Sequence, residues 1–281
     1  MQSVLVTGAS TGIGRATALR MDAAGWRVFA GVRKEQDAES LHEAGSGQLV
    51  PVRLDITSPE QVAAVAEKLA TELGGSGLDG LVNNAGITIP CPLEAIPLED
   101  FRRLLTVNLT GHLATTQAML PQLRMSKGRI VFVSSISSRR ALPMLSAYTA
   151  SKAGLNAVAD GFRQELRRWQ VGVSVIEPGS IETPIWDRGR SELDGIVERS
   201  RVDVEHLYGN LIATFSALAD RMLDRRLPVN KVVAAIEHAL VAKRPRRRYL
   251  VGREAKLQAM GIRLVPDPAL DFAITRYLGV S

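Results

Sequence analysis

Short runs of apolar, largely β-branched residues alternate with longer amphipathic stretches along the first two thirds of the chain. Runs that are apolar at every position are typical of parallel strands, because helices cover both faces of a parallel sheet. The alternation therefore predicts repeated strand–helix–strand units and a doubly wound parallel sheet. The runs with the length and composition of buried strands are Val4–Thr7, Val28–Val32, Val50–Leu54, Gly80–Asn83, Arg129–Ser134 and Val173–Glu177.

The stretches between these runs have the spacing of amphipathic helices. Ser58 precedes Pro59 as an N-cap precedes N1, and Val62, Val65 and Leu69 then fall on one helical face. The pattern predicts helices over Gly14–Ala24, Pro59–Leu73, Leu98–Gln122, Ala147–Trp169 and Pro228–Ala242, and a last strand over Tyr249–Gly252.

The chain of 281 residues has no low-complexity linker and no internal repeat. We therefore expect a single α/β domain of the Rossmann type over residues 1–252, with residues 184–227 forming helices beside the substrate. The amphipathic tail, residues 253–281, is expected to pack as a helical extension on this domain or on a sister subunit.

The single cysteine, Cys91, excludes an internal disulfide and is typical of a reducing compartment. Pro90 and Pro92 flank it, and we interpret it as a small apolar loop residue rather than a nucleophile. The sequence starts directly with a predicted strand, and its longest uncharged run, Leu104–Leu123, is rich in Thr, Asn and Gln. We expect no transmembrane segment and a cytoplasmic location.

The formal net charge of +6 is concentrated near the C-terminus, chiefly in the basic cluster Lys243–Arg248. A basic cluster can bind nucleic acid, but no helix-turn-helix, zinc or aromatic-interleaved pattern accompanies this one. We interpret it as a solvated loop before the last strand, and expect neither a nucleic-acid partner nor a metal site.

A glycine-rich segment, Thr7–Gly14, joins the first predicted strand to the first predicted helix. Glycines allow a tight turn and a close backbone approach to a diphosphate, and the helix N-terminus adds free N–H groups. The alternative is a glycine-rich turn without a ligand. The position of the segment between a strand and a helix favours the phosphate-binding interpretation.

The strongest chemical signal is Tyr148-Thr149-Ala150-Ser151-Lys152. Residues four apart lie on one face of a helix, so this spacing places the Tyr148 phenol beside the Lys152 ammonium. A free tyrosine has a pKa near 10, and a nearby cation lowers that pKa by favouring the phenolate. The sequence therefore predicts a tyrosine that works as an acid or base, against the alternative of an ordinary helix face.

These motifs together resemble the short-chain dehydrogenase/reductase family, in its single-domain branch. The glycine spacing TGxxxGxG and the 13 residues from Ser135 to Tyr148 match that family, as do Asn83-Asn84-Ala85-Gly86 and Pro178-Gly179-Ser180-Ile181-Glu182-Thr183. The resemblance covers roughly residues 3–185 in order. It implies a catalytic set of Asn108, Ser135, Tyr148 and Lys152.

The resemblance also implies a role for each member of this set. Ser135 would hydrogen-bond the reacting oxygen, although Ser134, Ser137 and Ser138 lie close enough to shift the register. Lys152 would also reach the nicotinamide ribose. Asn108 resembles the family's helix-bending asparagine and would hold a water that links Lys152 to solvent; the alternative is a structural hydrogen bond.

The residues after the second strand bear on the choice of cofactor. NAD-selecting folds place a carboxylate there, whereas this chain has Val32 followed by Arg33 and Lys34. Two cations can pair with a 2′-phosphate, so we expect NADP(H) in preference to NAD(H), unless both are ordinary surface charges. The full set of expected cofactor contacts is Gly8, Ser10, Thr11, Gly12, Ile13, Gly14, Arg33, Lys34, Asp55, Ile56, Asn84, Ala85, Gly86, Val107, Tyr148, Lys152, Pro178, Gly179, Ile181 and Thr183.

The middle of the chain looks like the hydroxysteroid and retinol dehydrogenase group, and Leu142, Met144 and Trp186 indicate an apolar pocket. The expected function is NADP(H)-dependent interconversion of a lipophilic alcohol and its carbonyl compound. The alternatives are a 3-oxoacyl-type ketoreductase, a nucleotide-sugar epimerase or dehydratase, and a non-catalytic NADP-sensing module. The resemblance also implies a homodimer or homotetramer, formed through the helices Leu98–Gln122 and Ala147–Trp169.

Overall fold

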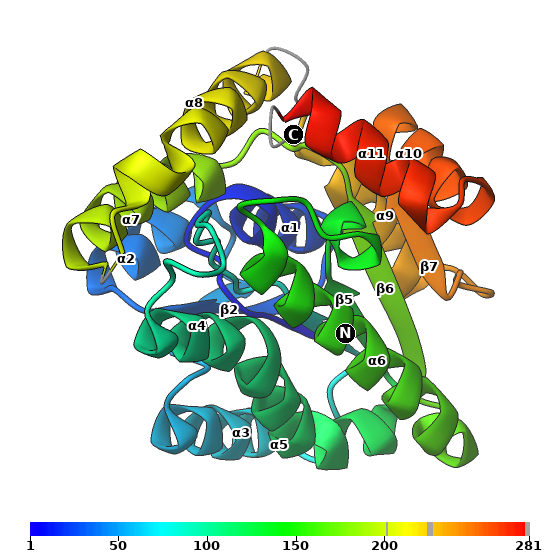
Figure 1. The fold of residues 1–281 in the computed structure, drawn as a ribbon. Coiled ribbons are helices and arrows are strands. Elements are labelled where there is room, and N and C mark those ends of the chain that lie inside the picture. The colour runs from blue at the N-terminus through cyan, green and yellow to red at the C-terminus, as the bar shows by residue number, and fades with distance from the viewer. Residues whose placement is uncertain (201, 224–226, 279–281) are drawn as a thin grey trace.

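The computed structural model describes residues 1–200, 202–223 and 227–278. Its centre is a seven-stranded sheet with the order β3-β2-β1-β4-β5-β6-β7, and every neighbouring pair is parallel. The predicted doubly wound α/β fold of the Rossmann type is therefore confirmed (Figure 1). The strands are β1 (Ser3–Val6), β2 (Arg27–Val32), β3 (Leu49–Arg53), β4 (Gly80–Asn83), β5 (Arg129–Val133), β6 (Gly172–Pro178) and β7 (Arg248–Val251).

Helices cover both faces of the sheet, which explains why its strands are apolar throughout (Figure 1). Val4 and Val6 point to one face, where α1, α2 and α9 pack, and Leu5 points to the other, where α3, α5 and α6 pack. The helices are α1 (Gly12–Ala23), α2 (Glu35–Ala44), α3 (Pro59–Leu73), α4 (Leu98–Leu105), α5 (Gly111–Ser126), α6 (Ser146–Glu165), α7 (Ile185–Arg199), α8 (Val204–Leu223), α9 (Asn230–Val241), α10 (Arg253–Leu264) and α11 (Asp267–Tyr277).

The sheet order reverses between β1 and β4, because the chain winds outward from β1 in both directions. Loops from the two halves diverge at this point and leave a crevice at the carboxyl edge of the sheet. The loops that follow β1, β4, β5 and β6 meet here, so the fold alone places the predicted functional residues along one edge.

Two helical elements differ from the prediction. The single helix expected over Leu98–Gln122 is two helices, α4 and α5, joined by a π-helical turn at Thr106–Thr110. The helix α2 was not predicted, because its only buried residue is Leu41 and most of its other residues are polar or charged.

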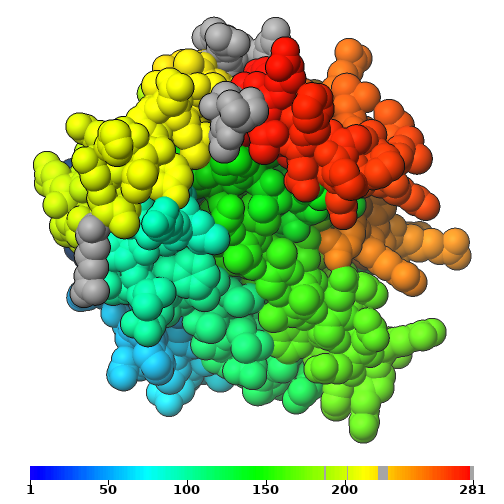
Figure 2. Space-filling view, viewed as in Figure 1, coloured from blue at the N-terminus to red at the C-terminus, as the bar shows by residue number. Residues whose placement is uncertain are grey.

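The C-terminal elements form a third apolar cluster above the sheet. Phe215 of α8 and Leu278 after α11 pack in it with Leu145 and Tyr148. In the space-filling view, α7 and α8 (yellow) and α11 (red) form blocks along one side of the molecule (Figure 2). Arg140, which lies between β5 and α6, forms ion pairs with Asp267 and Asp271 of α11.

No helix in the described part of the chain combines the length and the apolar character that a membrane crossing requires.

The basic cluster Lys243–Arg248 is only partly the solvated loop that was expected. Lys243 and Arg247 are exposed, but Arg248 begins β7 and its guanidinium turns inward. It donates to Glu177 at 3.2 Å and to Asp160 at 2.6 Å. The last cation of the cluster is therefore only partly exposed and pairs with two carboxylates of the fold.

Candidate active site

A cleft of about 990 Å³ runs along the carboxyl edge of the sheet. The loops after β1, β2, β3, β4, β5 and β6 all contribute to its wall, and α7 borders it on the outer side. Of the residues expected to contact a cofactor, the cleft is lined by Gly8, Ser10, Thr11, Gly12, Ile13, Arg33, Asp55, Ile56, Asn84, Ala85, Gly86, Val107, Tyr148, Lys152, Pro178, Gly179, Ile181 and Thr183.

The glycine-rich turn has the geometry of an anion cradle. Gly8 and Gly12 adopt φ values of +64° and +55°, in the left-handed region that favours glycine. No side chain caps the N-terminus of α1, so its first N–H groups remain available at the cleft wall. An uncapped helix N-terminus that faces a cleft fits the diphosphate of a dinucleotide.

Gly14 acts through the space that it leaves rather than by facing the cleft. A Cβ atom at this position would lie 2.1 Å from the Gly8 carbonyl oxygen and 2.4 Å from Asn84 Nδ2. The first turn of α1 can therefore approach the strand ends only because residue 14 has no side chain. Gly14 is not among the residues that line the cleft, which differs from its expected role as a contact.

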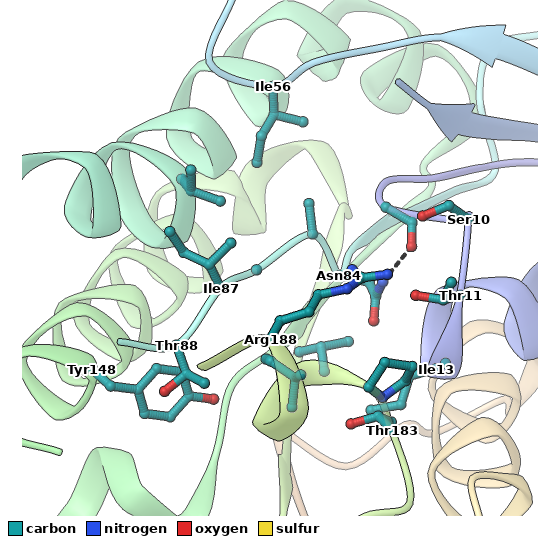
Figure 3. A pocket seen from close by; sticks show the side chains of 18 of the residues that line it. Ser10, Thr11, Ile13, Ile56, Asn84, Ile87, Thr88, Tyr148, Thr183 and Arg188 are labelled. Carbon is teal, nitrogen blue, oxygen red and sulfur yellow. Dashed lines mark hydrogen bonds between the residues drawn. The ribbon is translucent and has the colours of Figure 1, made fainter. Parts of the chain in front are cut away.

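Hydrogen bonds join the turn after β1 to the turn after β4 across the point where the sheet order reverses. The Thr7 hydroxyl accepts hydrogen bonds from the N–H groups of Asn84 and Ala85, at 2.9 and 3.1 Å. In return the Asn84 amide donates to the Thr7 and Gly8 carbonyls, at 3.0 and 3.1 Å. Figure 3 shows Asn84 beside the glycine-rich turn. These bonds hold both banks of the cleft at a fixed separation.

A buried histidine, which the sequence analysis missed, supports the β4 turn from below. His112 of α5 is fully buried, and its Nε2 lies 2.7 Å from the Ala85 carbonyl oxygen. Burial, with a smaller contribution from the charge of Lys152, lowers the pKa of His112 to about 3. The ring is therefore neutral at neutral pH, and we infer that its single N–H donates to Ala85. The available signal was its spacing of one helical turn from Asn108.

Asn108 lies in the π-helical turn and bonds to the backbone of the β4 loop. Its side chain accepts from the Ile87 N–H at 2.9 Å and donates to the Ile87 carbonyl at 2.9 Å. It also donates to the Ser151 hydroxyl of α6 at 3.1 Å. The extra residue of the π turn lets one side chain reach both neighbours. Asn108 is fully buried and stands behind the cleft wall rather than in it.

Tyr148 and Lys152 stand one helical turn apart on the buried face of α6, as their spacing predicted. Only 8% of Tyr148 and 3% of Lys152 is exposed. Lys152 Nζ lies 5.9 Å from the centre of the Tyr148 ring and donates to the Val133 carbonyl at 3.0 Å. Both side chains line the cleft, and Tyr148 points into it (Figure 3).

The pKa of the tyrosine differs from the expectation. Burial raises the pKa of Tyr148 to about 12, and the neighbouring Ser135 hydroxyl opposes that shift. Burial also lowers the pKa of Lys152 to about 8, so its ammonium stays mostly protonated at neutral pH but gives up its proton more easily than an exposed lysine. In this structure desolvation outweighs the cation that the Tyr148–Lys152 spacing supplies, because both groups are withdrawn from water.

Ser135 begins the turn after β5 and is held there by short hydrogen bonds. Its hydroxyl accepts from the Ser137 N–H at 3.1 Å, and its carbonyl accepts from the Ser138 hydroxyl at 2.6 Å. Asn156 of α6 donates to Ser138 at 2.8 Å. The helix that carries Tyr148 therefore also fixes the position of Ser135.

A buried carboxylate completes this support. Glu177 of β6 has no exposed surface, and it accepts from Asn156 at 3.2 Å and from Arg139 at 2.6 Å. Arg248 of β7 adds a second guanidinium at 3.2 Å. A buried carboxylate is stable when cations and hydrogen bonds satisfy it, and here two arginines and an amide do so.

The residues after β2 and β3 form the far end of the cleft. Arg33 lines it, whereas Lys34 is the N-cap residue of α2 and does not. The two cations that the sequence analysis treated alike are therefore separated by the start of the helix. Asp55 lines the cleft, and its carboxylate also accepts a hydrogen bond from the Thr57 N–H at 2.9 Å, which stabilises the turn after β3.

A second, smaller pocket of about 80 Å³ opens from the catalytic end. Ser135 belongs to both pockets, and the small one extends from it toward α8 and α10. Apolar side chains make up most of its wall: Leu142, Leu145, Trp186, Phe215 and Leu218.

Comparison with known proteins agrees with this geometry. A family model described as short chain dehydrogenase matches residues 2–194. Human retinol dehydrogenase 16 is 38% identical over 274 residues, covering 95% of this chain and 86% of its own. Mouse estradiol 17-beta-dehydrogenase 2 is 36% identical over 286 residues, covering 98% of this chain and 74% of its own. A short chain dehydrogenase from Burkholderia cenocepacia, solved in complex with NADP, has a TM-score of 0.73 at 28% identity and covers 98% of this chain and 99% of its own.

The chain belongs to the short-chain dehydrogenase family. It is an oxidoreductase that acts on CH–OH groups with a nicotinamide cofactor. The uncapped N-terminus of α1 and the left-handed glycines of the cradle fit such a cofactor. In this short-chain dehydrogenase the expected catalytic residues Ser135, Tyr148 and Lys152 meet at one end of the cleft, with Asn108 directly behind them.

The buried His112 predicts a specific loss of stability in acid. Its folded pKa of about 3 lies below the unfolded value of 6.5, so the unfolded chain takes up a proton first. The contribution of neutral His112 to the free energy of unfolding is therefore fully present above pH 6.5 and is lost as the pH falls toward 3. Between pH 7 and pH 5 the free energy of unfolding should fall by about 2 kcal/mol through this one group.

Urea unfolding of the unaltered chain and of His112→Gln at both pH values measures this contribution. In His112→Gln, the free energy of unfolding should lack the fall of about 2 kcal/mol between pH 7 and pH 5, whatever the stability of the variant at pH 7. His42→Gln, an exposed substitution on α2, is the control and should keep it. An equal pH dependence in all three proteins would contradict the assignment of a neutral buried ring.

Proposed function

We propose that this chain is an NADP(H)-dependent oxidoreductase that interconverts a lipophilic alcohol and its carbonyl compound, with Tyr148 as the proton donor or acceptor. The observation that carries the proposal is the meeting of Ser135, Tyr148 and Lys152 at one end of a cleft whose middle is the glycine-rich cradle. The cofactor would supply the hydride chemistry, and the protein would supply position and proton transfer.

The cofactor would lie along the cleft in a fixed direction. The N–H groups at Gly12 and Ile13 would hold the diphosphate, and Arg33 would pair with a 2′-phosphate at the adenosine end. Ile181 and Thr183, after β6, would hold the nicotinamide end beside Tyr148. The other lining residues of the expected contact set would complete the walls.

Tyr148 would act as a general acid in the reduction of a carbonyl. With a pKa of about 12 its phenol is protonated at neutral pH, and it can hydrogen-bond the carbonyl oxygen together with Ser135. In the oxidation of an alcohol the phenol must first lose its proton, and the Lys152 ammonium would stabilise that phenolate. The pKa of Lys152, about 8, lets it pass protons between Tyr148 and the Asn108 side of the site.

The substrate would be a bulky lipophile. The apolar pocket beside Ser135, of about 80 Å³, would take part of a hydrocarbon body whose oxygen faces Tyr148, and the rest would lie in the large cleft along α7. The names of the relatives, an estradiol 17-beta-dehydrogenase and retinol dehydrogenases, support the same chemical class. Within residues 184–227, the described helices α7 and α8 would form the outer wall of the substrate site, and α10 of the C-terminal tail would close one side of it; residues 201 and 224–226 lie outside the described residues. A cytoplasmic location stays a prediction.

Replacing Tyr148 by Phe removes the acid and leaves the shape of the cleft. We expect kcat to fall by about 100-fold or more in both reaction directions, because positioned proton transfer contributes about two to four orders of magnitude. The measurement is dinucleotide absorbance at 340 nm with a panel of lipophilic ketones and alcohols. Tyr277→Phe, at an exposed position on α11, is the matched control and should keep its turnover. A Tyr148→Phe enzyme with most of its activity would overturn the scheme.

Arg33 tests the cofactor preference. Loss of a charged hydrogen bond to the 2′-phosphate should raise the KM for NADPH by about tenfold or more in Arg33→Met and leave the KM for NADH unchanged. Lys34→Met is the control, since Lys34 does not line the cleft, and should change either KM by less than about twofold. Equal effects of Arg33→Met on both dinucleotides would argue against NADP(H) selection at this position.

We also propose that the chain forms a homodimer or homotetramer through α5 and α6. The family resemblance supports this proposal, and so does the position of both helices on one outer face of the sheet (Figure 1). Light scattering after gel filtration should then give at least twice the 30.4 kDa mass of one chain. A mass of one chain at micromolar concentration would contradict it.

A further inference from the structure

The glycine-rich cradle contains no cationic side chain. Its residues, Gly8–Gly14, are glycine, alanine, serine, threonine and isoleucine only. A dinucleotide diphosphate carries two negative charges, whereas a helix N-terminus offers the equivalent of roughly half a positive charge. Arg15, the first cation after the cradle, donates instead to the Ser40 carbonyl on α2. A cationic side chain from another element would therefore strengthen the binding of the diphosphate.

Five cationic side chains line the cleft, and most of them have other roles. Arg103 is bound to Asp100 and Glu192, and Arg199 is bound to Asp100. Lys152 stands at the catalytic end and Arg33 at the adenosine end. The fifth is Arg188, whose side chain makes no hydrogen bond or ion pair with any residue that the structure describes.

The packing of α7 places Arg188 across the cleft from the cradle. At the start of the helix, a Cβ at Gly12 would lie 3.1 Å from Thr183 Cγ2. Farther along, a Cβ at Gly189 would lie 2.8 Å from Thr88 Cγ2. The segment from Thr183 to Gly189 thus touches both banks of the cleft, and Arg188 sits next to the second contact.

The direction of the side chain agrees with this placement. Arg188 extends from α7 into the pocket, toward the side that Asn84 and the glycine-rich turn form (Figure 3). Arginine presents a planar fork of N–H groups that matches two phosphate oxygens at once. Its guanidinium would face the N–H groups of α1 from α7, on the other side of the cleft.

We propose that Arg188 binds the diphosphate bridge of the dinucleotide and so couples α7, the outer wall of the substrate site, to cofactor binding. This inference rests on the proposed function, because it requires a dinucleotide in the cleft. It makes Arg188 a binding residue for any dinucleotide, with no part in the choice between NADP(H) and NAD(H).

Isothermal titration calorimetry of the full chain at 0.15 M salt tests the inference with three probes. NADPH carries both the diphosphate and the 2′-phosphate, NADH carries only the diphosphate, and adenosine 2′-monophosphate carries only the 2′-phosphate. The proteins are the unaltered chain, Arg188→Met, Arg188→Lys and Arg190→Met. Arg190 lies on the same helix outside the cleft lining and pairs with Asp220 of α8, so it is the matched control.

In Arg188→Met we expect the Kd values of NADPH and NADH to rise together, by about tenfold or more, through loss of a charge-assisted hydrogen bond. Arg188→Lys should restore part of this loss. The Kd of adenosine 2′-monophosphate should change by less than about twofold, because this probe has no diphosphate for Arg188 to bind and salt weakens any longer-range attraction. Arg190→Met should bind all three probes like the unaltered chain.

Two results would overturn the inference while the proposed function stands. One is unchanged affinity of Arg188→Met for both dinucleotides, and the other is weakened binding of NADPH and adenosine 2′-monophosphate alone, which would assign Arg188 to the 2′-phosphate. If neither NADPH nor NADH gives binding heat with the unaltered chain, the result is different. It would contradict the proposed function and the inference together.

Discussion

The site depends on hydrogen bonds that join the two halves of the sheet where its order reverses. Thr7 at the end of β1 and Asn84 after β4 bond to each other through side chain and backbone. His112 then ties Ala85 to α5, and Asn108 ties the next residues to α6. A parallel sheet leaves its loops free to diverge at this point, so a cleft of fixed width requires such bonds. The catalytic helix, the cradle and the β4 turn consequently form one connected unit.

Burial within this unit changes the pKa values of its two ionisable catalytic residues. Tyr148 and Lys152 are withdrawn from water, which raises the pKa of the phenol and lowers that of the ammonium. Each shift disfavours the charged form of its group. Desolvation therefore favours a neutral phenol beside the lysine over a phenolate–ammonium pair. The arrangement suits a neutral acid that yields its proton only when negative charge develops on a substrate oxygen nearby. The spacing of the two residues alone could not reveal this, because it shows neighbours but not solvent.

The parts of the structure that were predictable have signals that are local in sequence. Strands such as Ser3–Val6 are apolar on both faces, and Tyr148 and Lys152 share a helix, so composition and spacing were enough. The missed parts depend on partners far along the chain. The π turn at Asn108 exists where its side chain bonds to Ile87, and Arg248 turns inward to Glu177, 71 positions away. Lys34 shows the limit most clearly, because it directly follows Arg33 in the sequence and only the start of α2 takes it out of the cleft lining.

The cradle is built mainly from backbone groups, whereas the apolar pocket is built from side chains. This difference explains how one fold can serve different substrates. The cradle presents glycine conformations and backbone N–H groups, and its geometry tolerates little change because a Cβ at position 14 would meet the Gly8 carbonyl. The apolar pocket is built instead from Leu142, Phe215 and Leu218, whose size can vary without moving the sheet. Two of these belong to α8, and α10 follows the last strand, so under the proposed function substrate selection would depend on elements that follow the catalytic core in the sequence. The helix α7 belongs to both parts, because it lines the cleft with Arg188 and the pocket with Trp186. A change of substrate that repositions α7 should therefore also alter how tightly the cofactor is held.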